Sequence, residues 1–415
     1  MKNLRVEEAR SLLLRAVRPV EEEEEVELWE AYDRVLARDA VAGEDIPSFD
    51  RSAMDGYALR SGDTLSPPAR LRVVGEVPAG RVWAGRLDPG TVVAISTGAP
   101  LPPDADAVIR QEEASEEEGW VLIRRRVEEG ENVSPRGEDL RAGVLALRRG
   151  TLIRAQEMGI LASLGWARVP VFARVRAGVV ATGDEVVNVD EPAGPGQVRN
   201  STAHLLGGLL CRAGALPFYL GRVPDKAEEI RRAIEQNLDR FHLLFTTGGV
   251  SVGRHDLLPR LVEEMGGRTL FWRVEMKPGR NIVAAEMGGR MLIGLSGNPA
   301  AALTTFELVV RPFVLALGRR PAGGPLETEA VVDRDLGGLG GTERYLRAAV
   351  RRRDGEFHAS PLWPQLPSVL SSFSGANGFI RVPKEKVALR AGEKVTVVLP
   401  APEDAFYAFS AGEEG

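Results

Sequence analysis

The sequence predicts a multidomain protein of the α/β plus β class, in which a central doubly wound α/β domain is joined to two β-rich parts. Its 415 residues exceed what one ordinary hydrophobic core organises. Apolar strands alternate with amphipathic helical stretches over residues 174–318, as in a parallel sheet covered by helices. Short β-type runs divided by Gly and Pro fill residues 43–140 and the last ~90 residues.

Two N-terminal stretches, 5–18 and 27–42, are expected to be helices because apolar residues recur there at intervals of three and four. The second has one apolar face made by Leu28, Trp29, Tyr32, Val35 and Leu36. The glutamates at 21–25 form a charge run typical of a solvated face or loop. A further short helix is expected around 155–164.

The α/β region contains three apolar strands, expected at 177–181, 242–245 and 291–295, each followed by an unusual loop. Ligands of open α/β sheets bind beyond the carboxyl ends of the strands, so these loops predict a binding site. The helices of this region are expected near 202–213, 225–239, 257–265 and 299–317.

The loop after the second strand, 246–253, reads TTGGVSVG and contains three glycines, three hydroxyls and no charge. Such a loop lets backbone N–H groups approach an anion closely, although a simple tight turn has the same composition. It matches neither GxxxxGK[ST] nor GxGxxG. Because three special loops share one sheet edge, a phosphate site is favoured, with the amides of 248–253 around the anion.

Carboxylates beside this loop suggest a magnesium site, since Mg²⁺ uses few protein ligands. Glu185 and Asp256 are expected to face the same crevice. The alternative for Asp256 is an N-cap of the helix from 257, and Asp225 with Glu228 fits a capping box. Asn298-Pro299 likewise fits an N-cap followed by Pro at the first helical position.

Lys277 and Arg280 bracket a Pro-Gly turn at the end of a strand expected at 270–276. Two cations in such a turn suit an oxyanion, and an exposed turn without a ligand is the alternative reading.

Composition excludes several classes of function. A net charge of −6 without a dense basic tract argues against a nucleic-acid partner. No apolar run approaches the ~20 residues of a membrane span. The single cysteine, Cys211, excludes an intrachain disulfide, favours a cytoplasmic location and is expected to be a buried packing thiol. The four histidines lack zinc-site spacing.

Taken together, these segments resemble the MoeA family of molybdopterin molybdenumtransferases, whose eukaryotic relatives include the E domain of gephyrin. The resemblance runs from about residue 5 to about residue 400. It rests on eight motifs in order: SAMDGYA (52–58), STGAP (96–100), PRGED (135–139), TGDE (182–185), TTGGVSVG with Asp256, KPGR (277–280), GNP (297–299) and SGANGFIRVP (374–383).

The resemblance implies a Mg²⁺-dependent reaction that inserts molybdenum from molybdate into adenylylated molybdopterin and releases AMP. It implies a homodimer whose active site joins the α/β domain of one subunit to the β-rich domain of the other. The implied domains are an elongated linking domain (1–42 and 141–173), an inserted β-rich domain (43–140), an α/β molybdopterin-binding domain (174–320) and a C-terminal β-barrel-like domain (321–415).

The resemblance also implies roles for individual residues. The catalytic set is Asp55, Asp139, Glu185, Asp225 and Asp256, of which Glu185 and Asp256 hold the metal. The substrate-binding set is Thr97, Thr247, Gly248, Gly249, Ser251, Gly253, Lys277, Arg280, Gly297, Asn298, Pro299, Arg347 and Ser368. Three positions depart from the family pattern: Ser296 replaces a proline, Arg280 a lysine and Arg254 an acidic residue.

Two other functions are kept as alternatives. One is a pterin adenylyltransferase-like enzyme, built on the same type of α/β domain but without the SAMDGYA module and the C-terminal β domain. The other is a non-catalytic cofactor-binding scaffold. The adenylyltransferase of the same pathway is also a candidate partner.

Overall fold

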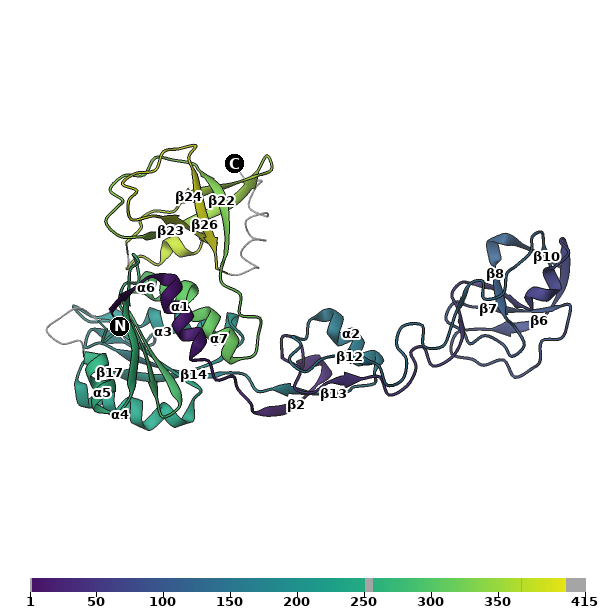
Figure 1. Cartoon of the computed structure of the whole chain (residues 1–415), viewed down its shortest axis with the longest axis horizontal. Helices are drawn as coiled ribbons and strands as arrows, with labels where there is room; N and C mark the ends of the chain where they lie inside the picture. Colours follow the sequence, from purple (N-terminus) through teal and green to yellow (C-terminus); the bar gives the residue numbers. More distant parts are fainter. Residues whose placement is uncertain (1, 251–256, 367, 401–415) are drawn as a thin grey trace. The chain divides into compact units, whose positions relative to one another are not determined.

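The structure of the chain is a computed structural model that describes residues 2–250, 257–366 and 368–400 (Figure 1). It divides into two compact units. The first comprises Met1–Glu24, Asp33–Val35 and Val171–Gly415, and the second comprises Glu25–Tyr32 and Leu36–Pro170. The chain crosses from one unit to the other within β2 (Glu23–Glu27), on either side of Asp33–Val35, and within β13 (Arg168–Phe172).

The first unit is built on a seven-stranded sheet in the order β1-β19-β20-β21-β18-β14-β17. β20 runs antiparallel to both of its neighbours, and the other pairs are parallel. The strands are β1 (Lys2–Leu4), β14 (Arg176–Thr182), β17 (Leu216–Val223), β18 (Leu243–Thr247), β19 (Arg268–Val274), β20 (Ile282–Met287) and β21 (Arg290–Leu295). A separate short ribbon pairs β15 (Val186–Val187) with β16 (Val198–Arg199).

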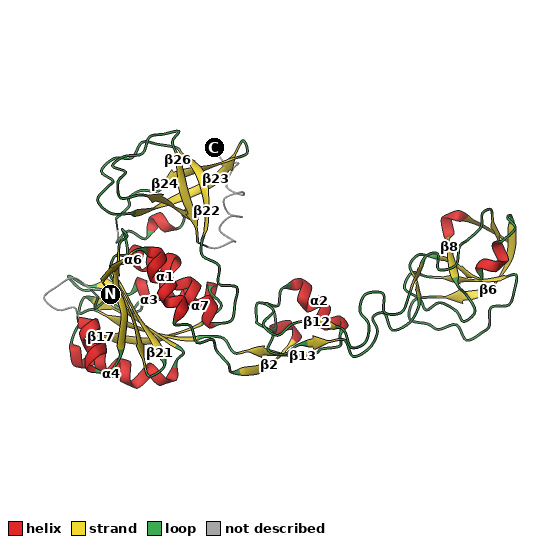
Figure 2. Ribbon diagram, viewed as in Figure 1, coloured by secondary structure: helices red, strands yellow, loops and turns green. Residues whose placement is uncertain are grey.

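Alternating side chains of the central strands supply two hydrophobic cores, one on each face of the sheet. Helices lie on both faces of this sheet (Figure 2). Val179 and Phe245 belong to the first core, while their neighbours Val180 and Leu244 belong to the second. Because both faces of these central strands are buried, their sequences are continuous apolar runs. The first core is covered by α1 (Val6–Arg15), α3 (Ser201–Arg212), α6 (Pro299–Thr305) and α7 (Arg311–Leu317), and the second by α4 (Ala227–Asn237) and α5 (Leu257–Glu264).

Among the described residues, one helical stretch is long and apolar enough to cross a membrane, Pro299–Leu317. This stretch consists of α6, a π-helical turn at Phe306–Val310 and α7, and 89% of it is buried inside the protein. Its buried Glu307 forms an ion pair with Arg212 of α3. The apolar composition of this stretch therefore reflects its position in the first core.

The C-terminal part of the first unit is a closed five-stranded barrel, as the predicted β-barrel-like domain requires. Around the barrel the order is β22-β24-β23-β25-β26, and its interior is a separate hydrophobic core. Closure pairs every strand edge, which a small β domain otherwise leaves open. The strands are β22 (Leu326–Val332), β23 (Arg344–Arg353), β24 (Glu356–Pro361), β25 (Gly378–Val382) and β26 (Lys394–Leu399).

The second unit is β-rich and centres on a six-stranded sheet in the order β8-β5-β7-β6-β10-β9. Its strands are β5 (Gly56–Leu59), β6 (Ala69–Val77), β7 (Thr91–Ile95), β8 (Ala107–Arg110), β9 (Ala114–Glu117) and β10 (Trp120–Ile123). Two ribbons pair β4 (Arg51–Ser52) with β11 (Val133–Ser134) and β3 (Ala40–Val41) with β12 (Leu145–Leu147). Its helix, α2 (Ala155–Ser163), confirms the helix expected around 155–164.

The structure confirms the predicted fold class, the three apolar strands with their helices, and the helix at 5–18. The helix expected over 27–42 is wrong. That segment contains the 3-10 turn Leu28–Glu30 followed by irregular chain, and Asp33 has φ +61°, which a right-handed helix excludes. Trp29 is 89% exposed, so the apolar spacing there does not mark a buried face. Glutamates 21–25 are exposed, as expected.

The prediction that Cys211 is a buried thiol is also wrong, because it is exposed. On α3 the buried positions are Thr202, Ala203, Leu206, Leu209 and Leu210. Cys211 follows this face by one residue and projects from the other side of the helix.

Candidate functional site

Three loops meet at the carboxyl edge of the central sheet, as the sequence predicts. β14, β18 and β21 are adjacent and parallel, with Ala181 paired to Thr247 and Thr247 to Leu295. The loops that follow these strands line a cavity of about 420 Å³. It brings together the predicted site residues Glu185, Asp225, Thr247, Gly248, Gly249, Gly297, Asn298, Pro299 and Ser368.

Gly248 marks a close approach between the first two of these loops. Its φ is +108°, and a Cβ there would lie 2.5 Å from the Thr182 carbonyl oxygen and 2.6 Å from Thr182 Oγ1. Only glycine fits this position. The Gly248 N–H donates to the Leu295 carbonyl at 2.9 Å, so it is already used within the protein. The Gly248 N–H, the first of the amides expected to surround the anion, is therefore not available to bind it.

The loop after β14 and the connection after β17 together give the cavity an acidic wall. Glu185 and Asp225 both line it. Desolvation raises the pKa of the Asp225 carboxyl, the Thr182 hydroxyl opposes this change, and the negative charges of Glu185 and Asp184 raise it further. The capping role considered for Asp225 is wrong, because α4 begins at Ala227 with Lys226 at its N-cap and no side-chain cap.

The third loop leads directly into α6. Asn298 occupies the N-cap and Pro299 the first helical position, as expected, but the Asn298 side chain makes no capping hydrogen bond. Ser296, at the position of the family's proline, accepts a hydrogen bond from the Asn298 N–H at 3.2 Å. Thr202 Oγ1 donates to the Gly297 carbonyl at 2.6 Å. The start of α3 thus holds this turn in place.

Sequence reasoning missed the start of α3 as part of the cavity wall. Asn200, Ser201 and Thr202 line the cavity, and Asn200 caps the helix by accepting the Ala203 N–H at 3.1 Å. Asn-Ser-Thr before an apolar helical run is a recognisable helix start, and helix N-termini favour anions. Asn281 was missed too: it lines the cavity, and among the described residues nothing hydrogen-bonds to its buried Oδ1.

The predicted oxyanion cations lie on the neighbouring turn. Lys277 and Arg280 are exposed, and neither lines the 420 Å³ cavity, whereas Asn281 directly after them does. Arg280 lines a second cavity, of about 950 Å³, beside the barrel. The structure therefore brings this turn to the border of the predicted site.

Arg347 and Ser368 belong to the barrel part and are linked by one segment. Arg347 is buried, and burial lowers the pKa of its guanidinium. Its Nη2 donates to the carbonyls of Pro364 (2.8 Å) and Leu366 (3.3 Å), just before Ser368. Ser368 lines the carboxyl-edge cavity and Arg347 does not. Arg347 therefore shapes the segment that brings Ser368 there.

Within the second unit, the structure brings Asp55 and Thr97 together. The Thr97 N–H and Oγ1 both donate to Asp55 Oδ1, at 2.7 and 3.0 Å. Asp139 is exposed like the other two and ends the turn that follows β11, which pairs with β4 close to Asp55. These loops, which composition alone does not distinguish from ordinary turns, thus gather around β4.

A further cavity of the first unit, about 450 Å³, lies at the amino ends of β18 and β21. Arg18, His242 and Arg290 are among its lining residues, and it contains none of the predicted site residues. The carboxyl-edge cavity is therefore the candidate site. Three predicted residues, Ser251, Gly253 and Asp256, lie outside the described residues.

Comparison with protein families and solved structures agrees with this architecture. Residues 4–165 match the MoeA N-terminal region (domain I and II), residues 178–316 a probable molybdopterin binding domain, and residues 329–399 the MoeA C-terminal region (domain IV).

The relatives of this chain include proteins named molybdopterin molybdenumtransferase. The protein of Bacillus subtilis (strain 168) is 36% identical over 391 residues, covering 92% of this chain and 91% of its own. That of Haemophilus influenzae is 32% identical over 397 residues, covering 95% and 98%. The crystal structure of the molybdopterin biosynthesis MoeA protein from Pyrococcus horikoshii OT3 superposes with a TM-score of 0.80 at 29% identity, covering 96% of this chain and 100% of that one. The chain therefore belongs to the MoeA family.

Proposed function

We propose that this protein is a molybdopterin molybdenumtransferase, which transfers molybdenum from molybdate to adenylylated molybdopterin and releases AMP. The observation that carries the proposal is the cavity where the glycine-rich loop, the acidic wall and the GNP turn meet. Backbone amides, a helix start and carboxylates that line one cavity suit a phosphoanhydride with its cation. The relatives that bear this name match over most of the chain.

The acidic wall fits a divalent cation. Desolvation raises the pKa of Asp225, and the negative charges of Glu185 and Asp184 raise it further, so negative charge gathers at this wall. In the described part of the chain no three His, Cys, Asp or Glu side chains form a metal-binding group. The proposed ligand set is smaller, Glu185 and Asp256 completed by water and phosphate oxygens, as is usual for Mg²⁺. Bound there, Mg²⁺ would neutralise charge on the phosphoanhydride.

The chain's own groups would bind and orient the two substrates. The start of α3 and the amides after Gly248 would face the phosphates. Lys277 and Arg280 would attract molybdate at the border of the cavity, because each supplies a charge that the neutral loop lacks. Arg347 would act by holding the segment of Ser368. No protein nucleophile is required for this transfer.

The decisive experiment incubates the protein with adenylylated molybdopterin, Mg²⁺ and molybdate and measures AMP. AMP release that depends on molybdate is expected. Glu185→Gln should abolish it, while Asp190→Asn, at an exposed acid of the same connection, should not. In a parallel incubation with ATP and molybdopterin, consumption of both would identify an adenylyltransferase. Pterin binding without AMP release would identify a scaffold.

We further propose that the enzyme is a homodimer with two shared active sites. The supporting observation is that Asp55, Thr97 and Asp139 belong to the second unit, whereas Glu185 and Asp225 belong to the first. Mixing inactive Asp55→Ala and Glu185→Ala proteins should restore about a quarter of wild-type activity, because about half the dimers would be mixed, each with one intact site. No recovery despite subunit exchange would contradict a shared site. A cytoplasmic location, with the pathway's adenylyltransferase as partner, completes the proposal.

A further inference from the structure

The turn that carries Lys277 is fixed through its main chain. The Lys277 N–H donates to the Glu343 carbonyl at 3.0 Å, and the Tyr345 N–H donates to the Lys277 carbonyl at 3.0 Å. On the other side of the turn, Thr305 Oγ1 donates to the Gly279 carbonyl at 3.0 Å. The position of Lys277 therefore depends on the chain at the start of β23.

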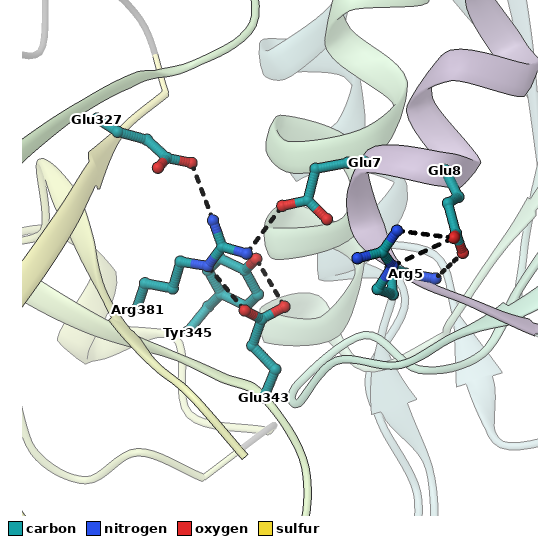
Figure 3. A network of polar contacts seen from close by, with 7 residues as sticks. All are labelled: Arg5, Glu7, Glu8, Glu327, Glu343, Tyr345 and Arg381. Atoms are coloured by element: carbon teal, nitrogen blue, oxygen red, sulfur yellow. Dashed lines mark hydrogen bonds and ion pairs between the residues drawn. The ribbon is translucent and has the colours of Figure 1, made fainter. Parts of the chain in front are cut away.

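That part of the chain is held by a charged cluster around Arg381 of β25 (Figure 3). Arg381 Nε donates to Glu343 Oε1 at 2.7 Å, Nη2 to Glu7 Oε1 of α1 at 2.8 Å, and Nη1 to Glu327 Oε1 of β22 at 3.3 Å. The Tyr345 hydroxyl donates to Glu343 Oε2 at 3.2 Å. One guanidinium thus bonds three carboxylates, which come from α1, from β22 and from the chain just before β23.

The cluster is only partly open to solvent. The side chain of Glu343 is 19% exposed and that of Arg381 is 25% exposed. Burial alone would lower the pKa of Arg381, but the hydrogen bond to Glu343 and the surrounding negative charge raise it overall. Burial, followed by the charge of Glu343, raises the pKa of Tyr345. Arg381 therefore stays charged, and without it the three carboxylates would repel one another.

We propose that Arg381 is a positioning residue for Lys277 and acts on it through Glu343. The path is short: the Arg381 guanidinium fixes the Glu343 side chain, and the Glu343 carbonyl receives the Lys277 N–H. The functional consequence rests on the proposed role of Lys277 in the use of molybdate. Loss of Arg381 would shift the Lys277 ammonium and would leave the loops after β14, β18 and β21 unchanged.

Kinetics test this path. Arg381→Gln should raise the KM for molybdate about tenfold while the KM for adenylylated molybdopterin stays within about twofold, because small misplacements of a binding group are costly. Arg381→Lys should restore part of the loss, since it keeps the charge without the planar fork. In a Lys277→Ala background, Arg381→Gln should add nothing to the molybdate effect. Additive effects, or an unchanged KM for molybdate, would overturn the proposal.

Hydrogen exchange gives a test that does not depend on activity. In the peptide covering 275–281, exchange of the Lys277 N–H should accelerate about tenfold or more in Arg381→Gln. The matched control is Arg390→Gln, because exposed Arg390 of the same barrel bonds Asp335 at 3.1 Å, away from this turn. Unchanged exchange in Arg381→Gln, or equal acceleration in the control, would refute the positioning role. If the wild type does not use molybdate, the proposed function fails, and exchange alone decides whether Arg381 positions Lys277.

Discussion

Replacing Gly248 by alanine should damage the candidate site more than the same change at the neighbouring Gly249. At Gly248 the new Cβ would lie 2.5 Å from the Thr182 carbonyl oxygen, about 0.9 Å inside the 3.4 Å at which ordinary contact begins. The obstructing atom belongs to the backbone of a central strand and cannot rotate away. A non-glycine residue at φ +108° adds about 1–3 kcal/mol of strain, and overpacking about 1–3 kcal/mol more.

Gly249→Ala is the matched control. Its φ of +69° lies in the left-handed region, and its nearest neighbour, Thr182 Oγ1, would be 3.3 Å away. The expected cost is only about 1–2 kcal/mol. Urea unfolding should show a larger loss in the free energy of unfolding for Gly248→Ala than for Gly249→Ala. The rate of AMP release should also fall more in Gly248→Ala. Equal losses in stability and activity would refute the argument that the close approach to Thr182 sets the shape of the loop.

Three predictions concern proton equilibria. Asp184→Asn removes a charge that raises the pKa of Asp225, so the acidic limb of the pH profile of AMP release should move to lower pH, and an unmoved limb would contradict this. The hydrogen bond from Arg154 lowers the pKa of Glu157 from 4.5 to about 2, so its stabilisation is present above pH 4.5 and is lost as the pH falls towards 2. The Tm difference between wild type and Glu157→Gln should shrink over that range, and a constant difference would refute the pairing. Burial lowers the pKa of His242 below 6.5, with Glu22 opposing, so protonation of the unfolded chain should destabilise the wild type as the pH falls through 6.5. Between about pH 7.5 and 5.5 the Tm of His242→Asn should fall less than the Tm of the wild type. An equal fall in both proteins would count against this effect of His242.

The location of the site could be predicted because it follows from local pattern and general topology. Apolar runs define β14, β18 and β21, and parallel neighbours necessarily end at one edge. The loops that follow them therefore meet, whatever their detailed geometry. Glycine and proline in those loops mark tight turns, so the sequence predicts the GNP turn at the start of α6, where the structure has it.

The errors arise where long-range contacts decide the outcome. The apolar spacing of 27–42 resembles a helix, yet Asp33 bonds Arg320, almost 300 residues away, in a backbone conformation that a helix excludes. The sequence around Asp225 suits a helix cap. The residues that affect its pKa, however, include Glu185 and Thr182, which come from another part of the chain. Asn281 carries no local signal and reaches the cavity only because β20 follows its turn.

The division of the chain into two units also sets the order in which they can fold on the ribosome. Residues 36–170 are contiguous, so the second unit has nearly all its strands once they have emerged. In the first unit, Lys2 and Leu4 of β1 pair with Trp272 and Val274 of β19. The N-terminal strand must therefore wait for roughly 270 residues of synthesis before its partner exists. Until then β1 and the apolar face of α1 stay without their native contacts, so a nascent chain stalled before β19 should display an already folded second unit and bind chaperones through its first residues.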